Sequence, residues 1–396
     1  MGTLRIGFAV AVLVGLPALL SSQGAASFEV VGRGPITNTH TTDLVVFRGV
    51  DGRDYAYTGT WGGCRVCVGD RIYAWDVSDP ASPVLTDSVL LDATIVGDLA
   101  VNAEGTLAVV TRQQAQSRRN GIAVLDLADP AHPRVHSQYF EGVTGGVQNV
   151  AIDGSLLYAV SSGTTELHVI DLADPADPRQ VGQWGLPAGA TTRYLEDVVV
   201  QDGMAYLSYW DDGLVILDIG EGGRGGTPRN PVQVGQYRYR TEFRRGEFGN
   251  TAVALPHTNS AGNRYVFVGD RIFPDQLDFS GEVETAGYIH VVDVRRPESP
   301  VEVARFDVPG AGVRKLWAAG DTLYATFHGG GLRAVDISGT LQGNLRGREI
   351  ASLRTADGRG IPPERPFAWG VQGHEGYVFA SDFNSGLWVT RLAPTP

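Results

Sequence analysis

One phrase recurs along this chain: a short apolar stretch, an Asp, an aliphatic residue, two further positions and often a Pro. Its first three copies read IYAWDVSDP, IAVLDLADP and LHVIDLADP. The Asp positions, separated by 50, 45, 47, 75 and 43 residues, are Asp76, Asp126, Asp171, Asp218, Asp293 and Asp336, and Arg391 stands at the matching position of a seventh copy. Repeats of this length in an all-β pattern are single supersecondary units that pack side by side.

Each copy divides into four short strands. In the third copy these are residues 149–152, 156–160, 167–170 and 179–184, with Gly and Asp between them as in β-hairpins. Seven such units predict an all-β, seven-bladed β-propeller built from four-stranded blades. A linear solenoid is disfavoured because neither end shows a capping repeat with a polar outer face.

The two ends of the chain predict how the ring closes. The last copy stops after its third strand, near residue 390, and has no fourth strand. Residues 28–33, FEVVGR, resemble the fourth strands of other copies, such as VQVGQY at residues 232–237. We therefore expect the N-terminal strand to pair with the last blade, which leaves few exposed strand edges.

Three elements carry a resemblance to a known family. They are the repeated Asp-aliphatic-x-Asp-Pro-x-x-Pro phrases, the segment YAYTGTW at residues 55–61 and the closing SDFNSGLW at residues 381–388. In these elements the chain resembles the LVIVD-repeat proteins, a family of propellers predicted on bacterial and archaeal cell surfaces. The resemblance implies the propeller fold and a place outside the cytoplasm, and it assigns no activity.

The first residues predict export. Arg5 precedes an apolar run at residues 6–20, and small residues at 24–26 offer a cleavage point, so we expect a signal peptide at residues 1–26. Residues 27–396 then form a single propeller domain with no membrane span, expected to be a periplasmic, secreted or surface-associated monomer; an uncleaved anchor is the alternative for the N-terminus. The formal net charge of −12 argues against a nucleic-acid partner, because phosphate binding needs a field of Lys and Arg.

The recurring Asp residues and the two cysteines have structural interpretations. An Asp that ends a strand can accept turn amide hydrogens, so we expect the repeated Asp to shape turns and not to catalyse. Cys64 and Cys67 form a CxxC without the βαβ context of a redox motif or further Cys for a zinc site. In an exported protein the default is a local disulfide between them.

A set of polar residues falls at the start of the innermost strand of successive blades and should line the central channel. These residues are Asp43, Asp98, Asn149, Asp197, Asn250 and Lys315, with Gly370 at the seventh position. Asp43, Asp98 and Asp197 are candidate ligands for a divalent cation, which prefers oxygen donors. The simpler interpretation is that these side chains hydrate the channel.

Loops between the second and third strands open on the same face as the loops between blades, here called the top face. They contribute Trp61, Arg112, Trp210, Asp211, Arg271, His328 and Phe383. Aromatic and Arg side chains in loops on a rigid scaffold favour recognition of a partner. The alternative for Trp61 and Phe383 is packing between neighbouring blades.

These observations lead to two functional hypotheses. The first is an exported, non-enzymatic propeller that binds a protein or a glycan through its top face, since the sequence shows no catalytic motif. The second is a metal-assisted hydrolase or lactonase with a divalent cation in the central channel. We expect the two to be separated by whether the axial carboxylates converge on one point.

Overall fold

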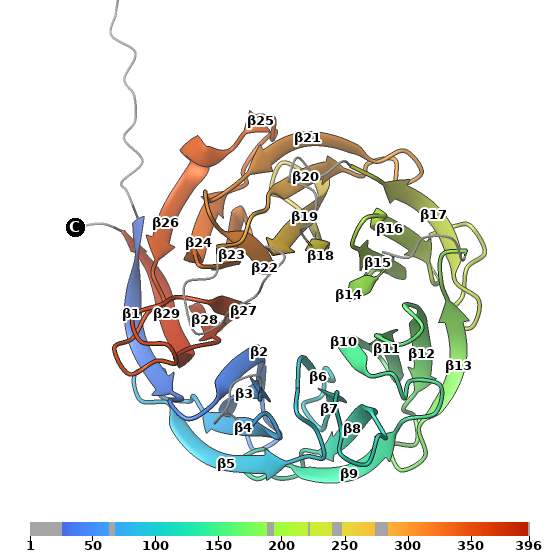
Figure 1. Ribbon diagram of the computed structural model, residues 1–396. Helices are drawn as coiled ribbons and strands as arrows, with labels where there is room; N and C mark the ends of the chain where they lie inside the picture. The colour runs from blue at the N-terminus through green and yellow to red at the C-terminus, as the bar shows by residue number, and fades with distance from the viewer. Residues whose placement is uncertain are drawn as a thin grey trace, which may run out of the picture.

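The computed structural model describes residues 26–62, 68–187, 194–220, 222–239, 248–273 and 284–394. These residues form seven sheets arranged as blades around a central axis (Figure 1). Within them the one helical element is the 3-10 turn η1 (Arg346–Arg348), and no helix is long and apolar enough to cross a membrane. The predicted all-β, seven-bladed β-propeller is confirmed.

The strands follow the chain around the ring in antiparallel meanders. The first three blades are β2 (His40–Arg48), β3 (Asp54–Trp61), β4 (Arg71–Asp76) and β5 (Val84–Leu90); β6 (Leu99–Val101), β7 (Leu107–Arg112), β8 (Gly121–Asp126) and β9 (Arg134–Tyr139); and β10 (Val147–Asp153), β11 (Leu156–Ser161), β12 (Leu167–Asp171) and β13 (Arg179–Trp184). The fourth and fifth are β14 (Leu195–Gln201), β15 (Met204–Tyr209), β16 (Gly213–Asp218) and β17 (Val232–Tyr237); and β18 (Phe248–Thr258), β19 (Arg264–Phe273), β20 (Ile289–Asp293) and β21 (Val301–Phe306). The sixth is β22 (Gly312–Ala319), β23 (Thr322–His328), β24 (Gly331–Asp336) and β26 (Glu349–Leu353), and the seventh is β27 (Ala368–His374), β28 (Tyr377–Asp382), β29 (Gly386–Pro394) and β1 (Ala26–Pro35).

The N-terminal strand closes the ring. Strand β1 pairs antiparallel with β29, from Ala26 opposite Pro394 to Pro35 opposite Gly386, and becomes the outermost strand of the seventh blade (Figure 1). The predicted closure is therefore confirmed. The last blade holds both ends of the described chain, and their pairing leaves no unpaired edge between the first and last repeats.

The recurring Asp residues shape the turn between the third and fourth strands. In every one of the six copies the Asp Oδ1 accepts a hydrogen bond of 2.8–2.9 Å from the backbone amide two residues later, as Asp171 does from Ala173. This is the Asx-turn geometry that short carboxylates favour. Their predicted structural role is confirmed.

Several outermost strands contain a Val-Gly pair, and the glycine is required there because the neighbouring blade lies too close for a larger side chain. A Cβ built on Gly182 would lie 2.3 Å from the carbonyl oxygen of Pro228, in the corresponding turn of the next blade, and Gly32 approaches Pro80 in the same way. In the second blade Ser137 occupies this place and donates a 2.6 Å hydrogen bond to the carbonyl of Pro175. The repeated phrase thus encodes contact between neighbouring blades as well as the turn.

Burial falls from the middle of each blade outward. All six residues of β16 are buried, whereas β5, an outermost strand, has none that is fully buried. The apolar clusters lie between adjacent blades, because each blade packs both faces against its neighbours. The one addition to the meander is β25 (Gly343–Asn344), which pairs parallel with the outer strand β21.

Candidate functional site

A repeated irregularity of the inner strands determines which side chains reach the channel. In six of the seven blades the register between the first two strands shifts by one residue near the top of the first strand. Such a β-bulge places two residues opposite one and redirects side chains locally. In four of these blades the residue directly after the shift occupies the channel position, as Asp197 does opposite Ser208 and Lys315 does opposite Thr326. In the first blade Asp43 lies within the shifted segment, between Thr41 and Leu44.

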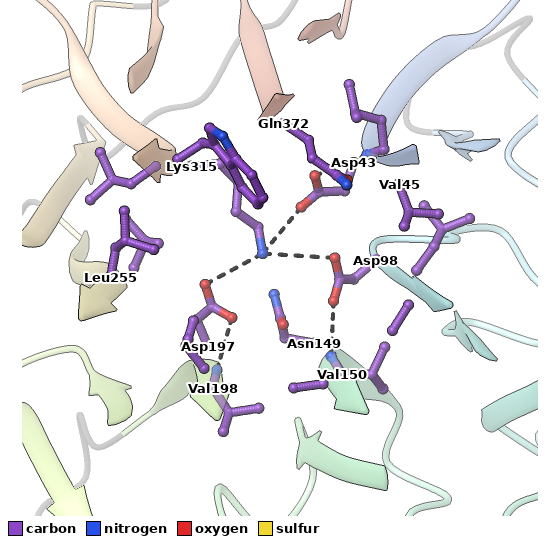
Figure 2. Close-up of a pocket in the computed structure, with 18 of the residues that line it drawn as sticks. Asp43, Val45, Asp98, Asn149, Val150, Asp197, Val198, Leu255, Lys315 and Gln372 are labelled. Carbon is purple, nitrogen blue, oxygen red and sulfur yellow. Dashed lines mark hydrogen bonds and ion pairs between the residues drawn. The ribbon is translucent and has the colours of Figure 1, made fainter. Parts of the chain in front are cut away.

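Three of the predicted carboxylates meet at one point, and that point is an ammonium group. The Nζ atom of Lys315 lies 3.3 Å from Asp43 Oδ2, 3.4 Å from Asp197 Oδ2 and 3.7 Å from Asp98 Oδ1 (Figure 2). The three Asp residues are at most 4% exposed. We call Asp43, Asp98, Asp197 and Lys315 the axial ring.

Further hydrogen bonds hold the carboxylates in place. Asp98 Oδ2 accepts a 2.9 Å hydrogen bond from the backbone amide of Val150 in the next blade, and Asp197 Oδ1 accepts one of 2.8 Å from Val198 (Figure 2). Because charge-assisted bonds to backbone amides are short and directional, the ring is preorganised by the blades themselves.

Burial and the opposite charges within the ring shift the pKa values of its groups in opposite directions. Burial raises the pKa of Asp98 to about 7, although the Lys315 ammonium opposes the shift and Asp43 and Asp197 add to it. Burial likewise raises the pKa of Asp197. For Lys315, burial acts against the charge, but the three carboxylates raise the pKa above its usual value. At neutral pH the lysine is therefore charged, and the raised pKa of Asp98 lies close to the surrounding pH.

Two further residues, Asn149 and Asn250, were predicted to line the channel, and only Asn149 lies at the ring. Asn149 lies at the ring with its Nδ2 atom buried and without a hydrogen-bond partner (Figure 2). The prediction for Asn250 is wrong, because the bulge of the fifth blade brings Val253 to the channel position. The Asn250 amide lies 3.4 Å from Asp211 Oδ1 instead.

A cavity of 310 Å³ lies between the axial ring and the far ends of the inner strands, on the side of the ring away from the top face. Its floor is the axial ring with Asn149, and its wall is formed two residues further along each inner strand. The wall residues are Val45, Ala100, Ala151, Val199, Leu255, Trp317 and Gln372. The Gln372 amide is hydrogen-bonded to the backbone of Val46, and the Trp317 indole nitrogen has no hydrogen-bond partner among the described residues, while the other wall side chains are aliphatic.

A second charged cluster lies nearer the top face, with Glu196 and Arg314 one residue along β14 and β22 from the ring and with Arg271 on β19. The Glu196 carboxylate pairs with Arg271 and accepts a 3.1 Å hydrogen bond from Trp210 Nε1. Arg314 is 1% exposed, lies with its Cζ 4.6 Å from the centroid of the Trp369 ring, and has two side-chain nitrogens without hydrogen-bond partners. We call Glu196, Arg271 and Arg314 the upper cluster. Burial disfavours the Glu196 charge, but Arg271 and Arg314 hold its pKa below the usual value.

Half-buried polar and aromatic side chains continue from this cluster across the top of the second, third and fourth blades. Gln148 Oε1 accepts hydrogen bonds from Gln113 Nε2 at 2.7 Å and from the Tyr194 hydroxyl at 3.3 Å, and Gln148 Nε2 lies 3.5 Å from Glu196. The rings of Tyr194 and Trp210 lie 4.6 Å apart, and Asp211 beside them is exposed. We call Gln113, Gln148, Tyr194 and Trp210 the top shelf.

The other predicted top-face residues lie below the surface. Arg112 is 1% exposed and donates hydrogen bonds to the carbonyl of Asp92 and to Gln138. These bonds stabilise the blade to which Arg112 belongs. His328 is fully buried, stacks on Phe367 at 3.9 Å and donates from Nδ1 to the carbonyl of Ala368. Burial, reinforced by Arg271 and Arg314, places its pKa well below the usual value.

Trp61 and Phe383 pack between neighbouring blades, which is the alternative to partner recognition that was considered for them from the sequence. Phe383 is 1% exposed and stacks on His40 and Trp369, and Trp61 meets both Trp369 and Phe383 edge to face. They belong to an aromatic cluster between blades, in which Phe383 is buried and Trp61 is partly buried.

The metal and disulfide predictions have different outcomes. Within the described ranges no group of three or more His, Cys, Asp or Glu side chains is arranged to hold a metal ion. The three candidate ligands Asp43, Asp98 and Asp197 do converge, but Lys315 occupies the point on which they converge. Cys64 and Cys67 lie outside the described residues, and the disulfide stays a prediction.

Glu196 and Arg314 were missed because sequence reasoning took one polar residue from each inner strand. The available signal was the pairing of charges, Glu196 next to Asp197 and Arg314 next to Lys315. In a regular strand successive side chains point to opposite faces, so only a predicted bulge would have assigned both members of a pair to the axis.

The seven sheets, six of four strands and one of five, and their polar axis define the chain as a β-propeller with a closed ring. Comparison with solved structures agrees: the β-propeller domain of Cps50 (Swd1) from Myceliophteria thermophila has a TM-score of 0.55 at 10% identity, over 93% of this chain and 100% of that one. The computationally designed Ika8 protein has a TM-score of 0.53 at 10% identity, over 91% of this chain and 98% of that one. At this identity the similarity concerns the fold alone.

The family model for the LVIVD repeat matches residues 144–184 and 192–238, which are the third and fourth blades. These blades are LVIVD repeats, and the resemblance seen in the sequence is confirmed. No curated protein matches the chain.

Proposed function

We propose that this chain is an exported, non-enzymatic propeller that binds a glycan through the top shelf. The observation that carries the proposal is the pairing of half-buried aromatic rings with half-buried amides at one place on the top face. Sugar rings stack on aromatic faces, and their hydroxyl groups exchange hydrogen bonds with amides and carboxylates. Tyr194 and Trp210 supply the rings, Gln113 and Gln148 supply the amides, and the exposed Asp211 supplies a carboxylate.

The network beneath the shelf supports this role by fixing its geometry. Glu196 holds Trp210, Gln148 and Arg271 together, so the aromatic and amide groups need little ordering when a ligand binds. Preorganised side chains lose less entropy on binding and so bind more tightly.

The metal-assisted hydrolase needs a cation at the axial carboxylates, and Lys315 lies at that point. A lysine supplies the positive charge but has no open coordination position for water or substrate. This geometry argues for binding over metal-assisted hydrolysis.

A glycan array probed with the mature chain tests the proposal, with the variants Trp210→Ala and Gln148→Ala. Removing a central aromatic contact should weaken binding by about tenfold or more. Gln201→Ala, on an exposed residue at the far end of β14, is the matched control and should bind like the wild type. An array without a hit, or equal binding by all variants, would reject the top shelf as a glycan site and leave a protein partner to be sought.

Export is tested on the same protein. Mass spectrometry of the protein recovered outside the cytoplasm should give an N-terminus at or next to Ser27. An intact N-terminus in that fraction would instead favour a retained anchor.

A further inference from the structure

Each blade contributes one wall residue to the cavity below the axial ring, and the wall is mainly apolar. Five of these seven residues are aliphatic, among them Val45, Val199 and Leu255, and a sixth is Trp317. All seven are half-buried, so part of each side chain stays accessible from the cavity. Apolar side chains that line a concave site and stay partly open to water are typical of ligand pockets. The wall therefore favours an occupant with a hydrocarbon part.

The charges of the floor disfavour a charged head group of either sign. The Lys315 ammonium occupies the point on which the three carboxylates converge, so the position that a cation would take is filled. The ring holds three carboxylates against this one ammonium, so its formal charge is −2 when all of its groups are ionised, and an anion is repelled. The head group that fits this floor is therefore uncharged.

The floor presents a hydrogen-bond donor and hydrogen-bond acceptors that an uncharged head group can use. Asn149 is 1% exposed, its Nδ2 atom has no partner among the described residues, and its side chain points toward the centre of the ring between Asp98 and Asp197 (Figure 2). A buried donor without a partner is costly, so an oxygen that accepts from it would stabilise the site. Asp43 Oδ2 is likewise buried and accepts no hydrogen bond within the described part of the chain. A hydroxyl group can accept from Asn149 and donate to a ring carboxylate.

We propose that this cavity binds an uncharged aliphatic molecule with a terminal hydroxyl group, with the hydroxyl at Asn149 and the ring carboxylates and the hydrocarbon part against the apolar wall. A water molecule can satisfy the same donor, but it leaves the wall hydrated, so the hydrocarbon part determines the affinity. The site is separate from the top shelf, because the axial ring and the upper cluster lie between them.

Calorimetric titration of the full chain with n-butanol, n-pentanol and n-hexanol tests the proposal without any variant. Each added CH₂ group should be buried against the wall, so the affinity should rise by about fourfold per CH₂ group along the series. The anion n-hexanoate carries the same acceptor atoms on a similar chain and should not bind, because the ring repels its charge. No binding of n-hexanol would mean that the cavity holds water only and would overturn the proposal, as would equal binding of n-hexanoate.

One pair of variants assigns the hydroxyl to the floor. Asn149→Leu keeps the approximate size of the side chain but removes the donor, so it should weaken the binding of n-hexanol by about threefold to tenfold. Asn230→Leu makes the same change at an exposed position in the turn before β17 and should leave the affinity unchanged. Unaltered binding by Asn149→Leu would contradict the assignment of the hydroxyl to this residue.

A second pair assigns the hydrocarbon part to the wall. Leu255→Asn replaces an apolar wall side chain by a polar one of similar size and should weaken the binding of n-hexanol by about fivefold or more. Leu85→Asn makes the same change on the exposed outer strand β5 and serves as the control, with an affinity like that of the wild type. Equal affinities in both variants and the wild type would place the alcohol outside this cavity and overturn the proposal.

Discussion

The axial ring and the upper cluster are adjacent polar layers that share the inner strands β14 and β22, yet their charges are opposite. The ring has three carboxylates around one ammonium, whereas the upper cluster has two guanidinium groups around one carboxylate. Glu196 and Asp197 contribute to different layers, and so do Arg314 and Lys315. A single bulged residue in a β-strand is thus enough to build two adjacent polar layers of opposite sign.

The two layers also differ in what they border. The axial ring forms the floor of a cavity, and Lys315 keeps 17% of its side chain exposed there. The upper cluster is closed in by Trp369, His328 and the top shelf. The ring therefore borders open space, whereas the upper cluster supports the residues above it.

The largest expected effect is that of Lys315→Met. It leaves three buried carboxylates without their cation, which should lower the free energy of unfolding by about 3–5 kcal/mol in urea denaturation near neutral pH. Lys315→Arg keeps the charge and should lose clearly less. A loss below about 1 kcal/mol in Lys315→Met would mean that the carboxylates do not depend on this lysine.

Glu196→Gln tests the other layer in the same way. It leaves Arg271 without its ion-pair partner and removes the charge that Arg314 stabilises from a longer distance, but it keeps a hydrogen-bond acceptor for Trp210, so we expect a loss of about 3 kcal/mol at neutral pH. Because the folded pKa of Glu196 is depressed, its contribution exists above its usual pKa and disappears as the pH falls through the folded value. The difference from the wild type should therefore shrink in acid, and a difference that grows in acid would contradict the assigned partners.

Asp98→Asn should show a pH dependence of opposite sign. The folded pKa of Asp98 is raised from 3.8 to about 7, so the stability conferred by its protonated form is lost as the pH rises toward 7. Relative to the variant, the wild type should lose up to about 1.4 kcal/mol per pH unit over this range and level off above it. Urea denaturation between about pH 5 and pH 8 measures the slope. A flat difference would show that Asp98 keeps an ordinary pKa.

The smallest expected effect is that of Arg314→Met. Arg314 has no carboxylate within ion-pair distance among the described residues, and its main contact is the ring of Trp369. Loss of this contact and of a buried charge should roughly cancel, so we expect a change within about 1 kcal/mol by urea denaturation. A loss above about 3 kcal/mol would mean that an anion pairs with this guanidinium in solution.

The axial ring could be predicted from the sequence because its residues occupy equivalent positions in successive repeats. Asp43, Asp98, Asn149, Asp197 and Lys315 were found by aligning repeats, and each lies at the ring. Asn250 was misplaced because the fifth repeat is lengthened and the bulge position within its longer inner strand is not visible in the sequence. The fold itself was predictable because the repeated phrase contains both the Asp that forms the turn and the Pro whose carbonyl contacts the neighbouring blade.

The top face was predicted less well, for a physical reason. Trp61, Arg112, His328 and Phe383 are typical of recognition surfaces by residue type, but burial depends on contacts made between blades far apart in the sequence. Phe383 and His40, for example, stack across the closure of the ring. Residue type alone cannot distinguish an aromatic cluster that packs blades from one that faces a ligand.

Elemental analysis of the mature protein, purified without chelator, tests most directly the claim that a lysine and not a metal ion neutralises the axial carboxylates. The account predicts no stoichiometric metal in the wild type, and none in an Asp98→Ala, Asp197→Ala variant. One equivalent of a divalent metal in the wild type that disappears in the variant would contradict it and restore the hydrolase hypothesis.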